Sequence, residues 1–509
     1  MNNKKKVLAS QPIAINFGIK IHTPTHIGGA QEKHGVKNLD FVITNRQLSL
    51  INDRDKLLSF VYHNNSDALA NDLINNSANL ENKIRQNLDI LSDYQFPFHG
   101  DTEELKRNIK YGVNERSIGI PGSSLKGAIV SRILNLHTTE LNFRKSQVPE
   151  KDIFGKKIEN KITRHLQVGD VMFDEMTIIN SKIYNLSHPI NSRDWEGCWK
   201  NGKNERRFDK SRFTTAYECI KVGALSKCRI VLNRAQLNTD TKSPSRWNDF
   251  WGGPIGDDHS EATKERIIRA FFSNIQKQTQ DYLQKELDFF EKYKEAEYAE
   301  EIIQTFKQLY EVSKTKILLR LGQGSGFHSI TGDWRCKDHL QSIIKPIRDK
   351  KNRNIYWKSR KIGFQPSDTN EIGIEFFPLG FIELLPIEQY AAALSEKADL
   401  RKKQEQQRIA AIEKAKEAAA QKEAARLEAI RPKMIDISEL KINKEKEVDA
   451  KVVGKEGKSI LFNVFVKGFE TKIFKLRYPV GMANDTIIRV TVRKTKKGIE
   501  CQGQPKIKK

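Results

Sequence analysis

The chain has 509 residues, and its 88 Lys and Arg against 64 Asp and Glu give a formal net charge of +24. At about 150 residues per domain, a chain of this length holds about three domains. So strong a positive charge favours a polyanion such as nucleic acid as partner, although it says nothing about the fold. There is no run of about 18 apolar residues and no signal-peptide core, so we expect a cytoplasmic protein without membrane contact.

The cysteines do not form a metal-binding or disulfide pattern. They stand apart, without a Cys-x-x-Cys pair or a neighbouring His-x-x-x-His, at Cys198, Cys219, Cys228, Cys336 and Cys501. We therefore expect no zinc or other metal site, no cofactor and no disulfide framework.

The first half of the chain predicts a mixed α+β domain over residues 1–240. Isoleucines and a phenylalanine alternate with other residues over 13–21, which predicts a half-buried strand. Residues 53–110 are polar and Asn-rich and are expected to form a helical insertion. A helix at 123–134 and strands at 171–183 and 224–232 then complete a ferredoxin-like unit.

Residues 241–387 predict a second ferredoxin-like unit. The stretch 261–315 is charge-laced and has an apolar stripe at helical spacing, so we expect helices there. A strand at 316–321, a glycine-rich loop, and strands at 372–377 and 381–385 follow it.

From residue 388 to residue 431 the chain contains neither Gly nor Pro, which predicts one long helix of about 65 Å at 1.5 Å per residue. Its large apolar residues are too sparse for a sustained heptad seam, so a solvated spacer helix is favoured over a coiled coil.

Residues 432–509 predict about five short strands, near 448–453, 459–466, 471–476, 486–492 and 499–502. This number of strands is typical of a small OB-like β-barrel. The module has 19 Lys and Arg and nine Asp and Glu, so 19 − 9 gives +10. Five aromatic residues interleave with these charges. They fill the barrel or, in part, bind single-stranded RNA, and protein docking is the alternative role.

A turn leading into a helix carries the first candidate site, in the run Ile-Pro-Gly-Ser-Ser-Leu-Lys-Gly at 120–127. We expect Ser123 or Ser124 to cap the helix and Gly127 to let a partner approach the backbone. Lys126 and Arg132 add positive charge near a helix start that already favours anions, which suits an RNA phosphate. An ordinary capped helix packed on a sheet is the alternative.

A glycine-rich loop carries the second candidate site, with Gly322, Gly324 and Gly326 at alternate positions between Arg320 and His328. Such glycines permit positive φ angles and close approach of a phosphate or sugar. The spacing lacks the third glycine of the dinucleotide fingerprint, so a Rossmann site is not favoured.

Together these two segments resemble the RAMP superfamily of CRISPR RNA-binding proteins. A third match is Thr-Pro-Thr-His-Ile-Gly-Gly at 23–29, which contains His26 and Gly28, and lesser matches lie at 152–155, 168–170 and 378–381. The combination covers roughly residues 10–386 and most resembles the fifth Csm-type subunit of type III-A effector complexes.

The resemblance implies a non-catalytic subunit that binds guide RNA, caps the backbone of the complex near the 3′ end of the guide, and assists guide maturation in antiviral defence. The implied partners are the guide RNA, other RAMP backbone subunits and host trimming nucleases. Expected RNA contacts are His26, Gly28, Ser123, Ser124, Lys126, Gly127, Arg132, Arg320, Gly322, Gly324, Gly326 and His328. The alternative is a metal-independent guide-processing ribonuclease with His26 as general base, although no second acid–base residue is apparent. Asp152 and Asp170 are isolated and lack the paired spacing of a metal nuclease.

Overall fold

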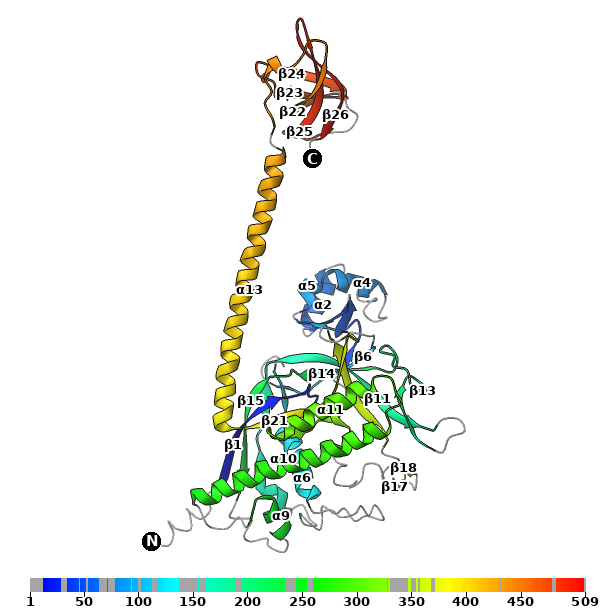
Figure 1. Cartoon of the computed structure of the whole chain (residues 1–509), viewed down its shortest axis with the longest axis vertical. Helices are drawn as coiled ribbons and strands as arrows, with labels where there is room; N and C mark the ends of the chain where they lie inside the picture. The colour runs from blue at the N-terminus through cyan, green and yellow to red at the C-terminus, as the bar shows by residue number, and fades with distance from the viewer. Residues whose placement is uncertain are drawn as a thin grey trace. The chain divides into compact units, whose positions relative to one another are not determined.

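The structure is a computed structural model that describes most of residues 12–507 (Figure 1). The main undescribed stretches, broken by a few isolated residues, are 29–33, 64–77, 112–116, 137–161, 189–193, 234–243, 254–259, 330–357 and 478–481. Most of the 152–155 motif and Cys336 lie outside the described residues. The chain divides into two compact units, Met1–Ser395 and Glu396–Lys509.

The first unit is built on a five-stranded sheet with β1 (Ile13–Ile21) at its centre. The expected alternation is confirmed, since Ile13, Ile15, Phe17, Ile19 and Ile21 are all buried. The strand order is β16 (Leu318–Arg320), β21 (Phe381–Pro386), β1, β15 (Leu225–Leu232) and β9 (Leu166–Val168). Each neighbouring pair is antiparallel.

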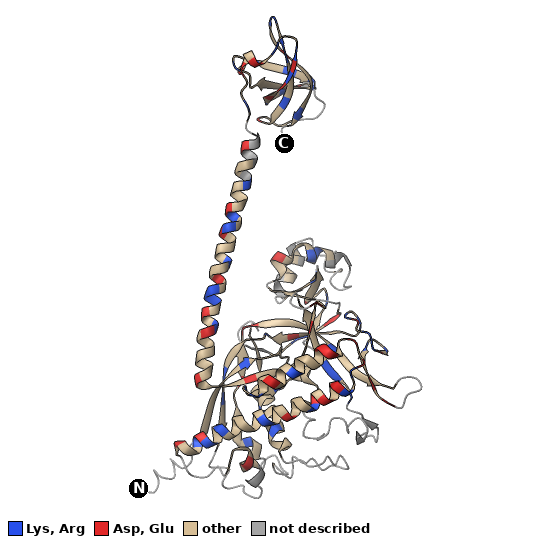
Figure 2. Ribbon diagram, in the orientation of Figure 1, with Lys and Arg blue, Asp and Glu red and all other residues tan. Residues whose placement is uncertain are grey.

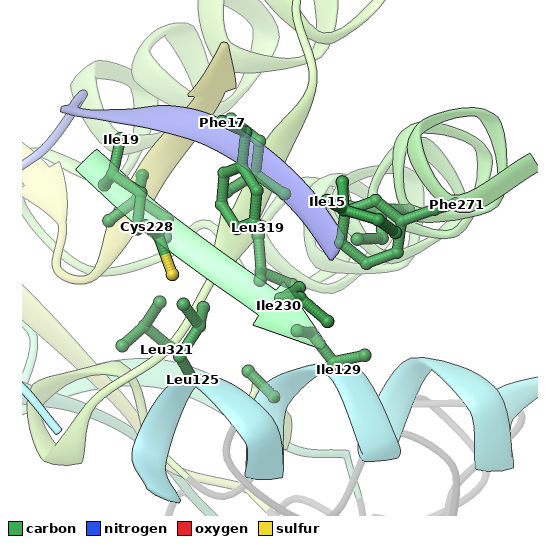
Figure 3. Close-up of a cluster of buried hydrophobic side chains, with 14 of the residues drawn as sticks. Ile15, Phe17, Ile19, Leu125, Ile129, Cys228, Ile230, Phe271, Leu319 and Leu321 are labelled. Atoms are coloured by element: carbon green, nitrogen blue, oxygen red, sulfur yellow. The ribbon is translucent and has the colours of Figure 1, made fainter. Parts of the chain in front are cut away.

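One hydrophobic core lies against this sheet (Figure 3). In that view, Leu125 and Ile129 of α6 (Gly122–Asn135) point toward β15 and Leu321. Phe17 packs against Phe271, with ring centroids 6.1 Å apart. Burial of branched and aromatic side chains from both halves of the chain is therefore what holds this sheet and its helices together.

A second, eight-stranded sheet surrounds the long strand β11 (Met176–Ser187). Its neighbours are β12 (Glu196–Lys200), β14 (Thr215–Ile220) and β19 (Arg360–Pro366). The remaining strands are β2 (Gly35–Val36), β6 (Glu104–Lys106), β13 (Asn204–Glu205) and β20 (Ile374–Pro378). Strands from both sides of residue 240 thus share each of the two large sheets, and the division of this unit into two ferredoxin-like domains stays a prediction.

The insertion at 53–110 is only partly helical, contrary to expectation. Helices α2 (Arg54–His63), α4 (Ala78–Gln86) and α5 (Leu88–Leu91) are followed by strands that begin at Tyr94. β3 (Phe41–Thr44), β4 (Gln47–Leu50) and β5 (Tyr94–Pro97) form a small sheet, and β6 joins the eight-stranded one. Polar composition therefore did not reveal the strands, because tertiary pairing overrides local propensity.

Short strands and helices complete the first unit. β7 (Lys110–Tyr111), β8 (Ser117–Ile120) and β10 (Val171–Phe173) form a three-stranded sheet, and β17 (Ile347–Arg348) pairs with β18 (Asn354–Ile355). The expected helices at 261–315 are confirmed as α10 (Glu261–Lys292) and α11 (Ala299–Ser313), and a shorter helix, α9 (Pro244–Phe250), precedes them. Of the helices described, none is long and apolar enough to cross a membrane.

The long helix is confirmed as α13 (Ile387–Ile430), and its first turns belong to the first unit. Tyr390 is buried against β1, where a Cβ at Gly18 would lie 2.2 Å from Cδ2 of the tyrosine. From residue 391 onward the described side chains are almost all exposed, as a solvated helix requires.

The second unit contains the five expected strands. They form one antiparallel sheet in the order β24 (Ile473–Arg477), β23 (Ser459–Val464), β22 (Glu445–Glu456), β25 (Ile487–Thr495) and β26 (Gly498–Ile507). Phe462 and Phe474 stack in its core, whereas Phe465 and Phe469 are only half-buried. The aromatic side chains are therefore divided between core and surface.

Ending the chain after Pro386 should destabilise the first unit, whereas ending it after Ser395 should not. The shorter chain loses the buried Tyr390 ring, and burial of a side chain of this size is worth about 2 kcal/mol. Urea denaturation of the two truncated chains measures the difference. Tyr390→Ala in the longer one should reproduce the loss, and equal stability of all three would contradict the packing role of Tyr390.

Candidate nucleic-acid interface

The first candidate segment forms helix α6, which begins one residue earlier than the serines that were expected to cap it. Pro121 is the N-cap residue and no side chain caps the helix from that position, so the prediction for Ser123 and Ser124 is wrong. Instead the backbone N–H of Gly122 donates to Oδ1 of Asp170 at 2.6 Å. A carboxylate of the protein itself therefore takes the place at the helix start that was expected for a phosphate.

Gly122 and Gly127 differ in what surrounds them. A Cβ at Gly122 would come within 2.0 Å of the Val168 carbonyl oxygen, so this glycine is required by packing. Gly127 is exposed, and in the described part of the chain nothing lies within 4 Å of the position of its missing Cβ. Glycine within a helix costs about 1 kcal/mol relative to alanine. Among the described residues, no packing contact accounts for that cost at Gly127.

Charged and polar residues of α6 are divided between surface and core. Ser123 is exposed, and Ser124 and Lys126 are half-buried. Burial lowers the pKa of Lys126. Arg132 is buried, so its guanidinium faces the interior, and the prediction that it lies beside RNA phosphates does not fit its position. The exposed side of this motif is therefore Ser123, Lys126 and Gly127.

The glycine-rich loop packs closely on the strand end that carries His26. The N–H of Gln323 donates to the His26 carbonyl oxygen at 3.1 Å. Gly322 has a φ of +93°, and a Cβ there would be 2.4 Å from the same oxygen. Gly324 is pressed against Leu379, 2.9 Å from Cδ1 to its missing Cβ. Contact within the protein thus explains these two glycines. At Gly326, which has a φ of +83°, no atom of the described residues lies within 4 Å of a Cβ.

Arg320 is buried, so its position does not favour the predicted contact with RNA. Its Nε donates to the Leu379 carbonyl oxygen at 2.9 Å, and its guanidinium also contacts the hydroxyl of Tyr282. The guanidinium carbon lies 5.2 Å from the centre of the Phe381 ring. Arg320 therefore ties β16 to α10 and to the turn before β21.

His26 is almost fully enclosed, with 1% of its surface exposed. Its Nδ1 donates to the Glu218 carbonyl oxygen at 2.9 Å, and its ring meets that of Tyr217 edge-on at 4.7 Å. Burial lowers the pKa of His26 to about 4. A histidine with this pKa is neutral and weakly basic at neutral pH, which suits a structural role better than base stacking or general base catalysis. His328 is buried as well.

A polar network that the sequence did not reveal holds the segment around His26 and Gly28. The side-chain oxygen of Asn108 accepts from Ile27 N–H at 3.3 Å, and Asn108 N–H donates to the Glu218 carboxylate at 2.9 Å. A Cβ at Gly28 would be 1.9 Å from Oε1 of Gln323. The only sequence signal was Glu218, an acid within an otherwise apolar strand, because such residues are seldom fully buried without a partner.

The three matched segments meet through their apolar residues. Ile27, Leu125 and Leu321 belong to the same hydrophobic core, and Figure 3 shows Leu321 beside Leu125. The strand end, the helix start and the glycine-rich loop therefore form one neighbourhood. Two of the expected contacts, Lys126 and Gly127, lie on the outer side of it.

A basic loop between β12 and β14 was missed by the sequence reasoning. Residues 200–213 contain six Lys and Arg against two acids, and Arg206 and Arg212 pair with Glu196 and Asp209. Lys203, Arg207 and Lys210 are exposed, and the Phe213 side chain beside them is 61% exposed. In the part of the chain that the structure describes, no cluster of His, Cys, Asp or Glu is arranged to hold a metal ion.

The fold is a mixed α+β fold in which the strand end at 23–28, the start of α6 and the glycine-rich loop lie together. The RAMP superfamily model matches residues 18–327, so the chain belongs to the RAMP superfamily. The match ends before α13 and the C-terminal sheet.

Solved structures of low sequence identity resemble the chain. One belongs to a "Csm-crRNA-target RNA ternary complex in type III-A CRISPR-Cas system", at 16% identity and a TM-score of 0.47, over 72% of this chain and 99% of that one. Csm5 of T. onnurineus shows 15% identity and a TM-score of 0.44 over the same shares. A chain of the type III-B Cmr-beta complex bound to target RNA gives 11% and 0.18, over 45% and 50%. No curated protein matches the sequence.

The buried position of His26 predicts a pH dependence of stability. Because its folded pKa of about 4 lies below the ordinary histidine value of 6.5, the unfolded chain takes up the proton first as the pH falls. The stabilisation by the neutral ring is complete above pH 6.5 and is lost between pH 6.5 and 4, by at most about 3 kcal/mol. Urea denaturation of wild type and His26→Gln across this range should give a difference in unfolding free energy that changes with pH. A constant difference would contradict the low pKa.

Proposed function

We propose that the chain is a non-catalytic guide-RNA-binding subunit of a type III-A CRISPR effector complex, which caps its backbone near the 3′ end of the guide. Membership of the RAMP superfamily supports the RNA-binding class. The Pro-x-His-Ile-Gly stretch and the order of the motifs favour the fifth Csm-type subunit. Partners of this kind are guide RNA, neighbouring RAMP subunits and the nucleases that trim the guide.

The observation that carries the proposal is Gly127, an exposed glycine within a helix and next to Lys126. Within the described residues no packing contact requires it. A helix without a side chain at that point lets a sugar-phosphate backbone lie against its main chain, with Lys126 beside it as a charge for the phosphate. Contacts of this type fix the position of RNA without reading its sequence.

The basic loop 200–213 supplies a second contact for the RNA. Its exposed cations suit phosphates, and the exposed ring of Phe213 offers a flat apolar surface on which a base can stack. The remaining expected contacts act indirectly in this proposal, because Arg320, Gly322, Gly324 and His26 hold the loop and the strand end in place.

The ribonuclease alternative is not favoured by the position of His26. A general base must reach the 2′-hydroxyl within hydrogen-bond distance, or through one water, and His26 is enclosed by Tyr217, Glu218 and Gln323. The role that we propose for His26 is to hold the strand end against the glycine-rich loop.

Gly127→Ala should weaken RNA binding without destabilising the fold. The added methyl group meets open space within the protein and improves helix propensity by about 1 kcal/mol, but it stands where the RNA backbone is expected. We expect a loss of roughly tenfold in affinity for repeat-spacer RNA, about 1.4 kcal/mol, by fluorescence anisotropy, with an unchanged or higher melting temperature.

Lys126→Ala should also reduce the salt dependence of binding, by about 0.7–0.9 in the slope of log K against log salt concentration. Lys277→Ala on the exposed side of α10 removes the same charge and is the matched control. Wild-type affinity in Gly127→Ala and Lys126→Ala would overturn the placement of RNA on α6, and an affinity that is flat with salt would overturn the proposed function.

The purified protein should not cut guide RNA, and His26→Ala should not alter the length of the guide in assembled complexes. The reason is the enclosure and low pKa of His26. Incubation of labelled repeat-spacer RNA with the wild-type protein, in EDTA, measures this. Cleavage that disappears in His26→Ala, while a folded protein is retained, would establish the ribonuclease alternative instead.

A further inference from the structure

Residues 432–509, called the C-terminal unit from here on, form a β-sheet domain with a hydrophobic core of its own. Its hydrophobic core consists only of residues from 435 to 501. Numbered from β22, the strands pair in the order 3-2-1-4-5, and the two edge strands, β24 and β26, lie in contact with each other. The sheet therefore curls toward closure, as Figure 1 also shows. It can be studied as a separate domain.

The two tight turns of this sheet carry unpaired lysines. The turn between β22 and β23 contains Lys458, and the turn between β25 and β26 contains Lys496 and Lys497. All three are exposed, and none forms an ion pair within the described residues of the unit. Their charge is therefore available to a ligand.

The outer surface of β23 and β24 is cationic and partly apolar. Lys475 and Arg477 are exposed there, next to Ile473, whose side chain is 59% exposed. The one acid of this surface for which an ion pair is described is Glu456, which pairs with Lys475 at 3.0 Å. The surface keeps a net positive charge after this pairing.

The outer surface of β22, β25 and β26 is different, because its charges pair with one another. Arg489 lies 3.5 Å from Asp449, and Lys506 lies 3.2 Å from Glu447. Arg493 stands opposite Glu445 on one neighbour and Glu500 on the other. In Figure 2 both charge colours are present on this part of the chain.

An aromatic ring joins the cationic surface to the turn at 496–498. Phe469, in the connection between β23 and β24, is half-buried, and a Cβ at Gly498 would lie 3.6 Å from its ring. Lys472 Nζ lies 5.9 Å from the centre of the same ring. Two lysine-bearing segments thus flank an aromatic ring that packs against the edge of the core and is only half-buried, whereas Phe462 and Phe474 stack inside the core.

We propose that the C-terminal unit is an OB-like barrel that binds single-stranded RNA, without sequence preference, on its β23–β24 face, defined as Lys458, Phe469, Lys475, Arg477, Lys496 and Lys497. In OB-folds the second and third strands and the turns after strands one and four bind oligonucleotides. The cations follow the phosphates, and a base stacked on an aromatic ring is worth about 1–3 kcal/mol. This site is separate from the one proposed on α6, because the unit lies outside the residues matched by the family.

Binding of a fluorescent oligouridine to residues 432–509 tests the proposal directly, with circular dichroism as the check of folding. The double variant K496S/K497S should bind at least fivefold more weakly and lower the salt slope by about 1.4, which is about 0.7 for each phosphate. K446S/K506S removes the same two charges from outside the β23–β24 face and should change affinity less than twofold. Phe469→Leu keeps an apolar side chain but loses the stacking surface, so it should also bind more weakly.

A folded domain that does not bind oligouridine at low salt would overturn the proposal, and so would equal losses in the two double variants. Tighter binding of double-stranded RNA than of the single strand would overturn it as well. In the full-length chain, K496S/K497S and Gly127→Ala should each remove part of the affinity for RNA, and their effects should add. Loss with only one of the two variants shows which of the two proposed sites fails.

Discussion

The first unit depends on the close contact between the strand end at 23–28 and the two glycine turns at 322–326 and 379–380. Gly380 N–H donates to the Pro24 carbonyl oxygen at 3.0 Å, and Leu321 N–H to the Gly380 carbonyl oxygen at 2.8 Å. A Cβ at Gly380 would lie 2.1 Å from the Leu321 oxygen. Only glycine permits backbones to approach so closely at positive φ. Much of the matched sequence therefore serves to hold the strand end at 23–28 against the turns at 322–326 and 379–380.

This contact divides the residues of the matched motifs into two physical classes. Glycines and charges inside the contact, such as Gly322 and Arg320, shape the protein, and their substitution should act first on stability. Gly127 and Lys126 lie outside it, so their substitution leaves this contact intact, and an effect on RNA is what we propose for them. One sequence motif therefore contains both buried residues that shape the fold and exposed residues. Only the burial of each side chain in the structure distinguishes the two kinds.

The sequence allowed much of the fold to be predicted, because strong periodicity and composition survive without tertiary information. The alternation of β1, the uninterrupted α13 and the five strands after it are examples. Burial was harder to predict. Arg320 follows a strand and resembles a ligand for phosphate, but its partners, Leu379 and Tyr282, are remote in sequence. The strands of the 53–110 insertion were missed for the same reason. They form by pairing with strands elsewhere in the chain, and their own polar composition does not indicate a strand.

The order of strands in the five-stranded sheet has a consequence for biosynthesis. β1 pairs with β21, so residues 17–21 find their partners at 382–386, near the end of the first unit. Until that segment has left the ribosome, one edge of β1 stays open, and an unpaired apolar strand edge is prone to wrong pairings. The long charged helix that follows is still being translated while the sheet closes. It gives the nascent chain a polar stretch between the closing sheet and the strand-forming segments of the second unit.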